Sequence, residues 1–309
     1  MRFFSRVPRI DFMAVHRPMM MFAALITVVS LGLVGFKGLD FGLDFTGGVL
    51  VEVSFEEPVN LDPIRTQMAE IGLGNATVQY FGTSSDVMIR AAPEEGAAAD
   101  EVSTQIIEAL AAHSELAPEL RRVEFVGPQV GAELATDGAL AALFAIIGIL
   151  IYVALRFEWK FAVGAITATV HDALLVLGFF ALFDVDFDLT VLAAVLALIG
   201  YSLNDTIVVY DRIRENFIEA RRADAIDVVN LSVNQTLART VVTGGTTLFV
   251  LLALFFVGGA VVHNFALALI VGIIVGTYSS IFVASSMVIL LGVTREDMLP
   301  KQEEVDDTP

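Results

Sequence analysis

The stretch that decides the fold runs from Leu189 to Tyr210 and reads LTVLAAVLALIGYSLNDTIVVY. It is long and apolar enough to cross a bilayer as a helix. It nevertheless contains a carboxylate, Asp205, inside the sequence GYSLNDT at 200–206. An ionisable side chain at membrane depth costs about 2.5–3.5 kcal/mol on insertion scales. Asp205 is therefore either a functional, proton-binding carboxylate or a buried acid that ties helices together through hydrogen bonds.

The composition of the whole chain is typical of a membrane protein. Of its 309 residues, 56% are hydrophobic and 17% are charged, against roughly 25% charged in soluble domains. There is no cysteine, and the four histidines are scattered, so thiolate chemistry is excluded and a histidine metal site is disfavoured. The formal net charge of −18 argues against nucleic acid as a partner. We expect no metal and no organic cofactor.

Six apolar runs are long enough to span a membrane, and they lie at 18–36, 138–155, 161–183, 189–210, 240–262 and 265–292. Basic residues are concentrated in the N-terminal segment 1–17, the connections 156–160 and 211–239, and the tail 293–309. The positive-inside rule then predicts six transmembrane helices with both chain ends in the cytoplasm. No cleavage motif follows the first run, which predicts a retained helix.

Residues 37–137 form a different kind of segment, which holds 18 acidic and 5 basic residues by count. Alternation predicts strands at 49–55, 77–81, 87–91 and 122–126, with a turn at 82–86. Helical spacing predicts helices at 61–71 and 98–113. The order β-α-β-β-α-β predicts a ferredoxin-like domain. Because it lies between the first and second spans, we expect it outside the cytoplasm.

The long connection at 211–239 has a helical pattern of its own. Ile226, Val229, Val233 and Leu237 fall on one face. The pattern predicts either an amphipathic helix on the cytoplasmic membrane surface or a solvated helix that packs on the bundle.

Polar residues near the spans are candidates for ion handling. Tyr201, Ser202 and Asn204 can hydrogen-bond to Asp205 in either protonation state. Arg239 immediately precedes the fifth span, whose first turns are small and polar and include Thr243. It can pair with Asp205, or it can be an ordinary topology anchor.

A second polar pair lies near the middle of the third span. His171 and Asp172 are neighbours there, and together they can relay protons or form a helix-packing network.

Small residues predict close helix packing. The glycines with this expected role are Gly200, Gly244, Gly245, Gly272 and Gly276. The last two form a GxxxG pattern beside Ser279 and Ser280, which we interpret as a packing face.

A glycine-rich motif, GLDFTGG, follows the first span, and its defining residues are Gly42, Asp44, Thr46, Gly47 and Gly48. No Gly-Lys-Ser/Thr follows, so it is not a phosphate loop. We expect a tight turn that feeds a strand, with Asp44 free to bind locally.

Several motifs resemble the SecF branch of the SecD/SecF family of protein-export membrane proteins. They are GLDFTGG at 42–48, VGPQVGAEL at 126–134, the segment 199–216, QTLART at 235–240 and SSIFVASS at 279–286. The resemblance implies half of a resistance-nodulation-division (RND) bundle, six helices with one outer domain, in the bacterial inner membrane with that domain in the periplasm. It also implies a SecD partner, the SecYEG channel, in some cases YajC, an exported unfolded polypeptide as cargo, and surrounding lipid.

The resemblance further implies protons as the coupling ion. It places the family's proton path on Asp205 and Arg239, with a further carboxylate supplied by SecD, and matches His171 and Asp172 to a less firmly assigned position. The chain is then not an enzyme.

Three other functions are compatible with parts of the pattern. One is half of an RND exporter for small molecules. Another is an intramembrane aspartyl protease that uses Asp172 and Asp205, although its Gly-x-Gly-Asp motif is missing. The last is a purely structural scaffold for the channel.

Overall fold

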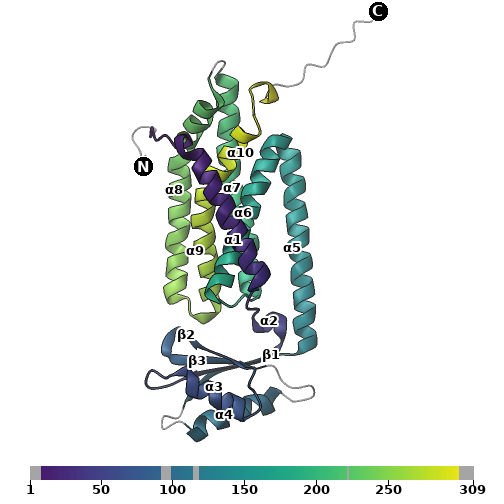
Figure 1. The fold of residues 1–309 in the computed structure, drawn as a ribbon, viewed down its shortest axis with the longest axis vertical. Coiled ribbons are helices and arrows are strands. Elements are labelled where there is room, and N and C mark those ends of the chain that lie inside the picture. The colour runs from purple at the N-terminus through teal and green to yellow at the C-terminus, as the bar shows by residue number, and fades with distance from the viewer. Residues whose placement is uncertain (1–7, 92–98, 114–117, 221–222, 299–309) are drawn as a thin grey trace, which may run out of the picture.

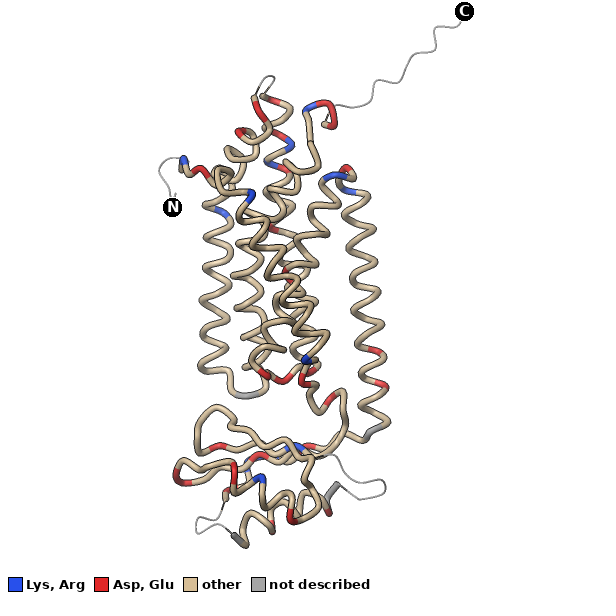
Figure 2. Tube along the Cα trace, viewed as in Figure 1, with Lys and Arg blue, Asp and Glu red and all other residues tan. Residues whose placement is uncertain are grey.

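The chain folds into a long helical bundle with an α/β domain at one end (Figure 1). The structure, a computed structural model, describes residues 8–91, 99–113, 118–220 and 223–298. The start of the first long helix and the end of the last one lie at the end of the bundle opposite the α/β domain. Charged residues gather toward the two ends of the bundle, and its middle is almost free of them (Figure 2).

Within the described residues, six helices are long and apolar enough to cross a membrane. They are α1 (His16–Phe36), α5 (Pro128–Arg156), α6 (Trp159–Phe183), α7 (Leu189–Glu219), α8 (Ala225–Val257) and α9 (Ala260–Ser279), the last continuing through a π-helical turn, η2 (Ser280–Ala284), into α10 (Ser285–Leu290). Short 3-10 turns, η1 (Met13–Val15) and η3 (Glu296–Met298), lie near the two ends of the chain. The helix α9 packs against α6, α7 and α8, so side chains from four helices can meet around it.

The α/β domain has the element order and sheet topology of the ferredoxin-like fold. Its elements are β1 (Gly48–Ser54), α3 (Leu61–Glu70), β2 (Thr77–Phe81), β3 (Thr83–Ala91), α4 (Ala99–His113) and β4 (Glu119–Val126). The strand order is β2-β3-β1-β4 and every pairing is antiparallel. Val51, Ile89 and Ile106 are among the fully buried side chains of the core that the sheet forms with the two helices. The fold-class prediction, a six-helix bundle with one βαββαβ domain, is confirmed.

The predicted turn at 82–86 is wrong, because β3 already begins at Thr83. The chain reverses at Gly82, whose φ of +81° lies in the left-handed region that glycine adopts most easily. Residues 83–86 are all polar, so they carry no alternation to predict a strand, but Ser54 pairs with Asp86 across the sheet. The last strand is also longer than predicted and begins at Glu119.

The glycine-rich motif forms a single helical turn, α2 (Leu43–Thr46), where we expected only a tight turn. Thr46 closes this turn by donating its hydroxyl to the carbonyl of Gly42, at 3.1 Å. Gly47 and Gly48 follow with φ values of +67° and +124°. A Cβ on Gly48 would lie 2.6 Å from the carbonyl oxygen of Ala91 on β3, so both backbone conformation and space require glycine there.

Asp44 does not bind locally. Its Oδ2 accepts a hydrogen bond from the backbone N–H of Leu189, at 3.1 Å, 145 positions along the chain. Asp188 caps the same helix, α7, by accepting from the N–H of Val191. Two carboxylates at a helix N-terminus are favourable because the backbone N–H groups there are unpaired and the helix dipole is positive.

The connection at 211–239 is not a separate helix on a membrane surface. The helix α7 continues to Glu219 and α8 begins at Ala225. Val229 and Val233 are buried in one cluster with Ile213 and Phe217 of α7. The apolar face therefore packs on the protein itself, as the second interpretation supposed, because the two long helices extend past the predicted spans side by side.

We predict that Gly48→Ala lowers the free energy of unfolding by at least about 3 kcal/mol, because it combines an unfavourable backbone angle with a clash. Gly72→Ala is the matched control. Gly72 also has a positive φ, +86°, but nothing lies near its missing side chain, so the expected loss is about 1 kcal/mol. Unfolding of the purified full-length protein in detergent measures both. Equal losses would show that the strand carrying Ala91 moves aside freely.

Candidate functional site

Two carboxylates are buried inside the bundle, one on α6 and one on α7. The side chain of Asp172 is 1% exposed and that of Asp205 is 9% exposed. The sequence placed both in apolar segments, and the structure shows how their oxygens are satisfied. Among the described residues, each carboxylate accepts two hydroxyl hydrogen bonds, and neither is within ion-pair distance of a lysine or arginine.

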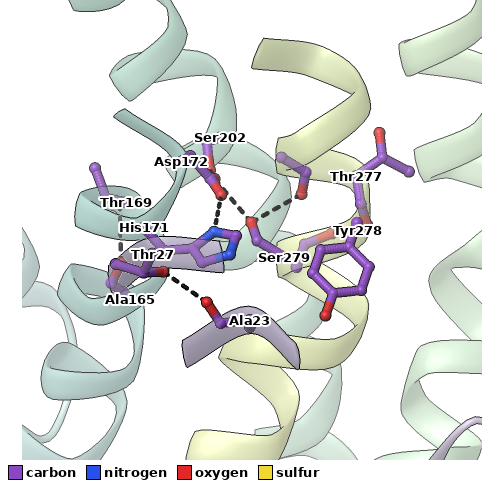
Figure 3. A network of polar contacts seen from close by, with 12 residues as sticks. Ala23, Thr27, Ala165, Thr169, His171, Asp172, Ser202, Thr277, Tyr278 and Ser279 are labelled. Carbon is purple, nitrogen blue, oxygen red and sulfur yellow. Dashed lines mark hydrogen bonds and ion pairs between the residues drawn. The ribbon is translucent and has the colours of Figure 1, made fainter. Parts of the chain in front are cut away.

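Asp172 lies in a compact polar cluster between α6, α7 and α9 (Figure 3). Its Oδ2 accepts hydrogen bonds from the hydroxyls of Ser202 and Ser279, the latter at 2.7 Å. Its Oδ1 lies 2.9 Å from Nδ1 of His171. The imidazole ring faces Tyr278, with 6.2 Å between the ring centroids.

The second ring nitrogen of His171 is the unusual atom of this cluster. Nε2 is buried and has no hydrogen-bond partner among the described residues. In the tautomer that donates from Nδ1 to Asp172, Nε2 is an acceptor, and an imidazole acceptor can take up a proton. The structure thus brings the predicted pair together and adds two serines to it.

Asp205 lies in a second cluster between α7, α8 and the π-helical turn. Its Oδ1 accepts from the hydroxyl of Thr240 at 2.9 Å, and its Oδ2 accepts from Ser280 at 2.8 Å. Ser285 stabilises the π-helical turn by donating to the backbone carbonyl of Ser280. Such turns are frequent at functional sites, where they change the direction of side chains within a helix.

The two clusters are joined through two helices. Ser202 and Asp205 are three residues apart on α7, so they lie on the same face. Ser279 and Ser280 are consecutive, and each donates to a different carboxylate. A hydroxyl can donate to a carboxylate or accept from a carboxylic acid. The same partners can therefore satisfy each acid in its charged and in its neutral form.

The expected pair between Asp205 and Arg239 is not formed. Arg239 is exposed and makes no ion pair with any residue in the described ranges. Its neighbour Thr240 faces Asp205 instead. Consecutive residues of a helix point about 100° apart, so one of them can face the acid only if the other turns away.

The other polar residues predicted to support Asp205 do not surround it. Ser202 binds the other acid, Asp172. Asn204 is exposed and Tyr201 is half-buried, and neither side chain hydrogen-bonds to a described residue. Thr243 is exposed, and its hydroxyl donates a hydrogen bond to the backbone carbonyl of Arg239 in the same helix, at 2.9 Å.

The predicted packing glycines divide into two groups. Gly272 packs directly on Leu198, and a Cβ on Gly276 would lie 3.6 Å from Oδ2 of Asp172. Gly244 is buried near Thr277, also in ordinary contact. Gly200 and Gly245 are exposed with nothing near them, so no close helix approach depends on these two.

Three of the hydroxyls that complete the site, those of Thr240, Ser279 and Ser280, are not evident from the sequence as partners of the acids. The sequence pattern indicated helix packing for Ser279 and Ser280, and Thr240 is one of the small polar residues at the start of the fifth span. The available signal was a polar doublet inside an apolar span. Metal binding has no support in the part of the chain that the structure describes, where no group of three or more His, Asp or Glu residues could bind an ion.

Comparison with known proteins assigns the chain to a family. Residues 105–294 match the family described as "Protein export membrane protein SecD/SecF, C-terminal", and residues 32–59 match the SecD/SecF GG motif. The chain belongs to the SecD/SecF family. The longer match contains both acids and their serine partners, and the shorter one contains the glycine-rich motif around α2.

Relatives within the SecD/SecF family are similar over nearly their whole length. The protein translocase subunit SecF of Vibrio alginolyticus is 48% identical, covering 96% of this chain and 94% of the relative. The protein translocase subunit SecF of Pseudomonas aeruginosa is 47% identical, covering 98% and 99%. These SecF relatives and the six apolar helices indicate a multi-pass membrane protein.

Solved structures of the SecD/SecF family share the fold. The crystal structure of SecDF from Thermus thermophilus, a translocon-associated membrane protein, superposes with a TM-score of 0.83 at 38% identity. SecDF in a super-membrane-facing form superposes with a TM-score of 0.69 at 39% identity. The alignments cover 92% and 93% of this chain but 39% of each SecDF chain, so this chain spans well under half of those longer proteins.

We predict that Ser280→Ala lowers the free energy of unfolding by about 1–3 kcal/mol, because Oδ2 of Asp205 loses its hydroxyl partner in a buried position. Ser286→Ala is the control. Ser286 is equally buried, but its hydroxyl has no described partner, so its removal should change stability by no more than about 0.5 kcal/mol. Thermal unfolding in detergent compares the two. A loss of the same size in both variants would mean that packing, not the bond to Asp205, accounts for the effect.

Proposed function

We propose that the chain is a proton-coupled subunit of a bacterial protein-export complex. In this proposal it assembles with a SecD partner and acts with the SecYEG channel, with YajC as a further possible member. It uses the proton gradient across the inner membrane to assist export of unfolded polypeptides. The α/β domain lies on the periplasmic side, and both chain ends lie in the cytoplasm.

The observation that carries the proposal is the hydroxyl environment of Asp205. A carboxylate placed only to tie helices together would gain most from a fixed cation, because a charge-assisted pair is stronger than a neutral hydrogen bond. Thr240 and Ser280 instead are groups that serve both protonation states. Such an environment suits an acid that binds and releases a proton. The Asp172 cluster, in which Nε2 of His171 has no hydrogen-bond partner among the described residues, has the same character and is the second member of the proposed path.

Arg239 is assigned a role between chains. It lies on an exposed face of α8, next in sequence to the residue that binds Asp205. In the proposed complex this face meets the SecD partner, so that Arg239 can approach a carboxylate of that chain. The alternative role, a topology anchor at a helix end, needs no such contact.

The energy available to such a path is sufficient to shift a helix packing equilibrium. One proton that crosses 100 mV releases about 2.3 kcal/mol, and each pH unit adds about 1.4 kcal/mol. When protonation of Asp205 changes the free-energy difference between two helix arrangements by this amount, the ratio of their populations changes by one to three orders of magnitude. The free energy released by one or a few protons is therefore large enough to shift the bundle from one helix arrangement to the other.

The geometry is unfavourable to the protease alternative. An aspartyl protease needs two carboxylates that share a proton at about 3 Å. The four oxygens of Asp172 and Asp205 instead contact the side chains of five different residues, His171, Ser202, Thr240, Ser279 and Ser280. The small-molecule exporter has no specific observation in its favour, and the SecF relatives disfavour it.

We predict that Asp205→Asn assembles normally but loses gradient-dependent export. The loss should be at least about tenfold, because proton transfer through a positioned side chain contributes about a hundredfold or more. Inverted membrane vesicles with the translocation machinery measure export with and without an uncoupler. Asp211→Asn is the control, since it changes an exposed acid of the same helix that pairs with Arg156. If Asp205→Asn kept its full response to the gradient, the chain would be a scaffold.

A further inference from the structure

The sheet of the α/β domain presents a nearly buried arginine toward the bundle. On β3, Val87, Ile89 and Ala91 face the domain core. Because side chains alternate along a strand, Arg90 faces the opposite side, where the bundle lies (Figure 1). Its side chain is 10% exposed. An arginine so well covered needs partners, and its partners belong to segments outside the sheet.

Arg90 binds two segments that lie far apart in sequence. Its NH1 donates to the backbone carbonyl of Phe41 at 2.9 Å and lies 3.7 Å from the carboxylate of Asp40. Its NH2 lies 2.7 Å from Oδ1 of Asp186. Gln79, on the neighbouring strand β2, donates to the other oxygen of Asp186 at 3.0 Å. The carboxylate of Asp186 thus has an ion-pair contact with β3 and accepts a hydrogen bond from β2.

Asp186 belongs to the short loop between α6 and α7, residues 184–188. This loop is bound on several sides. Phe187 donates its N–H to the carbonyl of Asp40 at 2.7 Å and accepts from the N–H of Gly42 at 2.8 Å. Asn264, at the start of α9, donates to the backbone carbonyl of Asp186. The loop therefore joins the domain to the helices that carry Asp172 and Asp205.

Acidic groups surround this contact. Asp40, Asp184 and Asp186 are close enough to affect one another, and Lys37 pairs with Asp184 at 2.9 Å. Burial raises the pKa of Asp40 above its ordinary value, and the charge of Asp186 raises it further, while Arg90 acts in the opposite direction. The positive charge of Arg90 offsets the repulsion between Asp40 and Asp186, which lie on the two segments that the arginine joins.

The rest of the sheet is not packed tightly on the bundle. A cleft of about 860 Å³ lies between them. It is lined on the domain side by residues such as Tyr80 and Phe81, and on the bundle side by residues such as Phe256 and His263. Other attachments lie around α2, where a Cβ on Gly131 of α5 would lie 2.9 Å from the backbone nitrogen of Gly47 and where Asp44 accepts from the N–H of Leu189. Among the described attachments, the contacts of Arg90 and Gln79 with Asp186 are made by strands of the sheet itself.

We propose that Arg90 is the positioning residue that makes the α/β domain follow the joined ends of α6 and α7. It binds Asp186 on the helix side and the backbone of Phe41 on the domain side, and Gln79 strengthens the same contact. A displacement of either helix end moves the 184–188 loop, and the loop moves the sheet. The consequence for export rests on the proposed function, whereas the orientation of the domain does not.

The experiment measures the domain's orientation directly. The chain has no cysteine, so spin labels can be attached at two introduced sites, Ala69→Cys on α3 and Val261→Cys on α9, both exposed. The full-length protein in lipid nanodiscs should give a narrow distance distribution between the labels. Arg90→Gln should shift or broaden that distribution by about 2 Å or more, the size of a domain rearrangement.

Two further variants keep the result decisive. Asp186→Asn removes the same ion pair from the helix side and leaves the sheet untouched, so it should produce the same change even if Arg90→Gln folds poorly. Arg121→Gln removes an exposed arginine of β4 whose ion pair, among the described residues, is with Glu119 of the same strand, and it should change nothing. An unchanged distribution in Asp186→Asn, or an equal change in Arg121→Gln, would overturn the proposal.

Export and proton uptake by vesicles separate this inference from the proposed function. Arg90→Gln should lose gradient-stimulated export but retain proton uptake, whereas Asp205→Asn should lose both. If Arg90→Gln altered the orientation and left export intact, the consequence for export would be overturned. If Asp205→Asn kept both activities, the proposed function would fail, and the distance measurement would still decide the role of Arg90.

Discussion

The structure of the bundle depends on burying two carboxylates, Asp172 and Asp205, among apolar helices. An unpaired charge in such a place costs several kcal/mol, so the neighbouring helices must present hydrogen-bond donors at the right positions. Five side chains from α6, α7, α8, α9 and the π-helical turn do so. The helices also approach closely at the acids, since a Cβ on Gly276 would lie in ordinary contact with both Ser202 and Asp172.

The type of donor matters as much as its presence. Hydroxyl groups rotate and can either donate or accept, whereas a guanidinium group only donates and stays charged. Asp172 and Asp205 are surrounded by the first type, and the arginine expected beside Asp205 is turned outward. Under the proposed function this separates two tasks. The hydroxyls allow the acid to change its protonation state inside this chain, and Arg239 is left available to a neighbouring subunit.

The α/β domain is attached to the bundle by a different kind of contact, made of charges and backbone hydrogen bonds. The loop between α6 and α7 pairs with the segment that leads into β1, and Asp44 and Asp188 together cap the start of α7. The glycine-rich motif thus connects the sheet, the loop and the helix start within a few residues. Through these contacts, a change in the packing of α6 and α7 near the acids can displace the sheet.

The sequence by itself determined the six apolar spans, the ferredoxin-like order of strands and helices, and the presence of two acids in apolar segments. These are properties of length, periodicity and composition, which are local along the chain. Only the tertiary structure decided that Thr240 and not Arg239 faces Asp205, that Ser279 and Ser280 donate to different acids, that Asp44 caps α7, and that Arg90 binds Asp186. Each of these depends on the rotation of one helix against another or on contacts between residues far apart in sequence. A rotation of one residue, about 100°, exchanges one neighbour for the next and leaves the hydrophobic pattern of a membrane span almost unchanged.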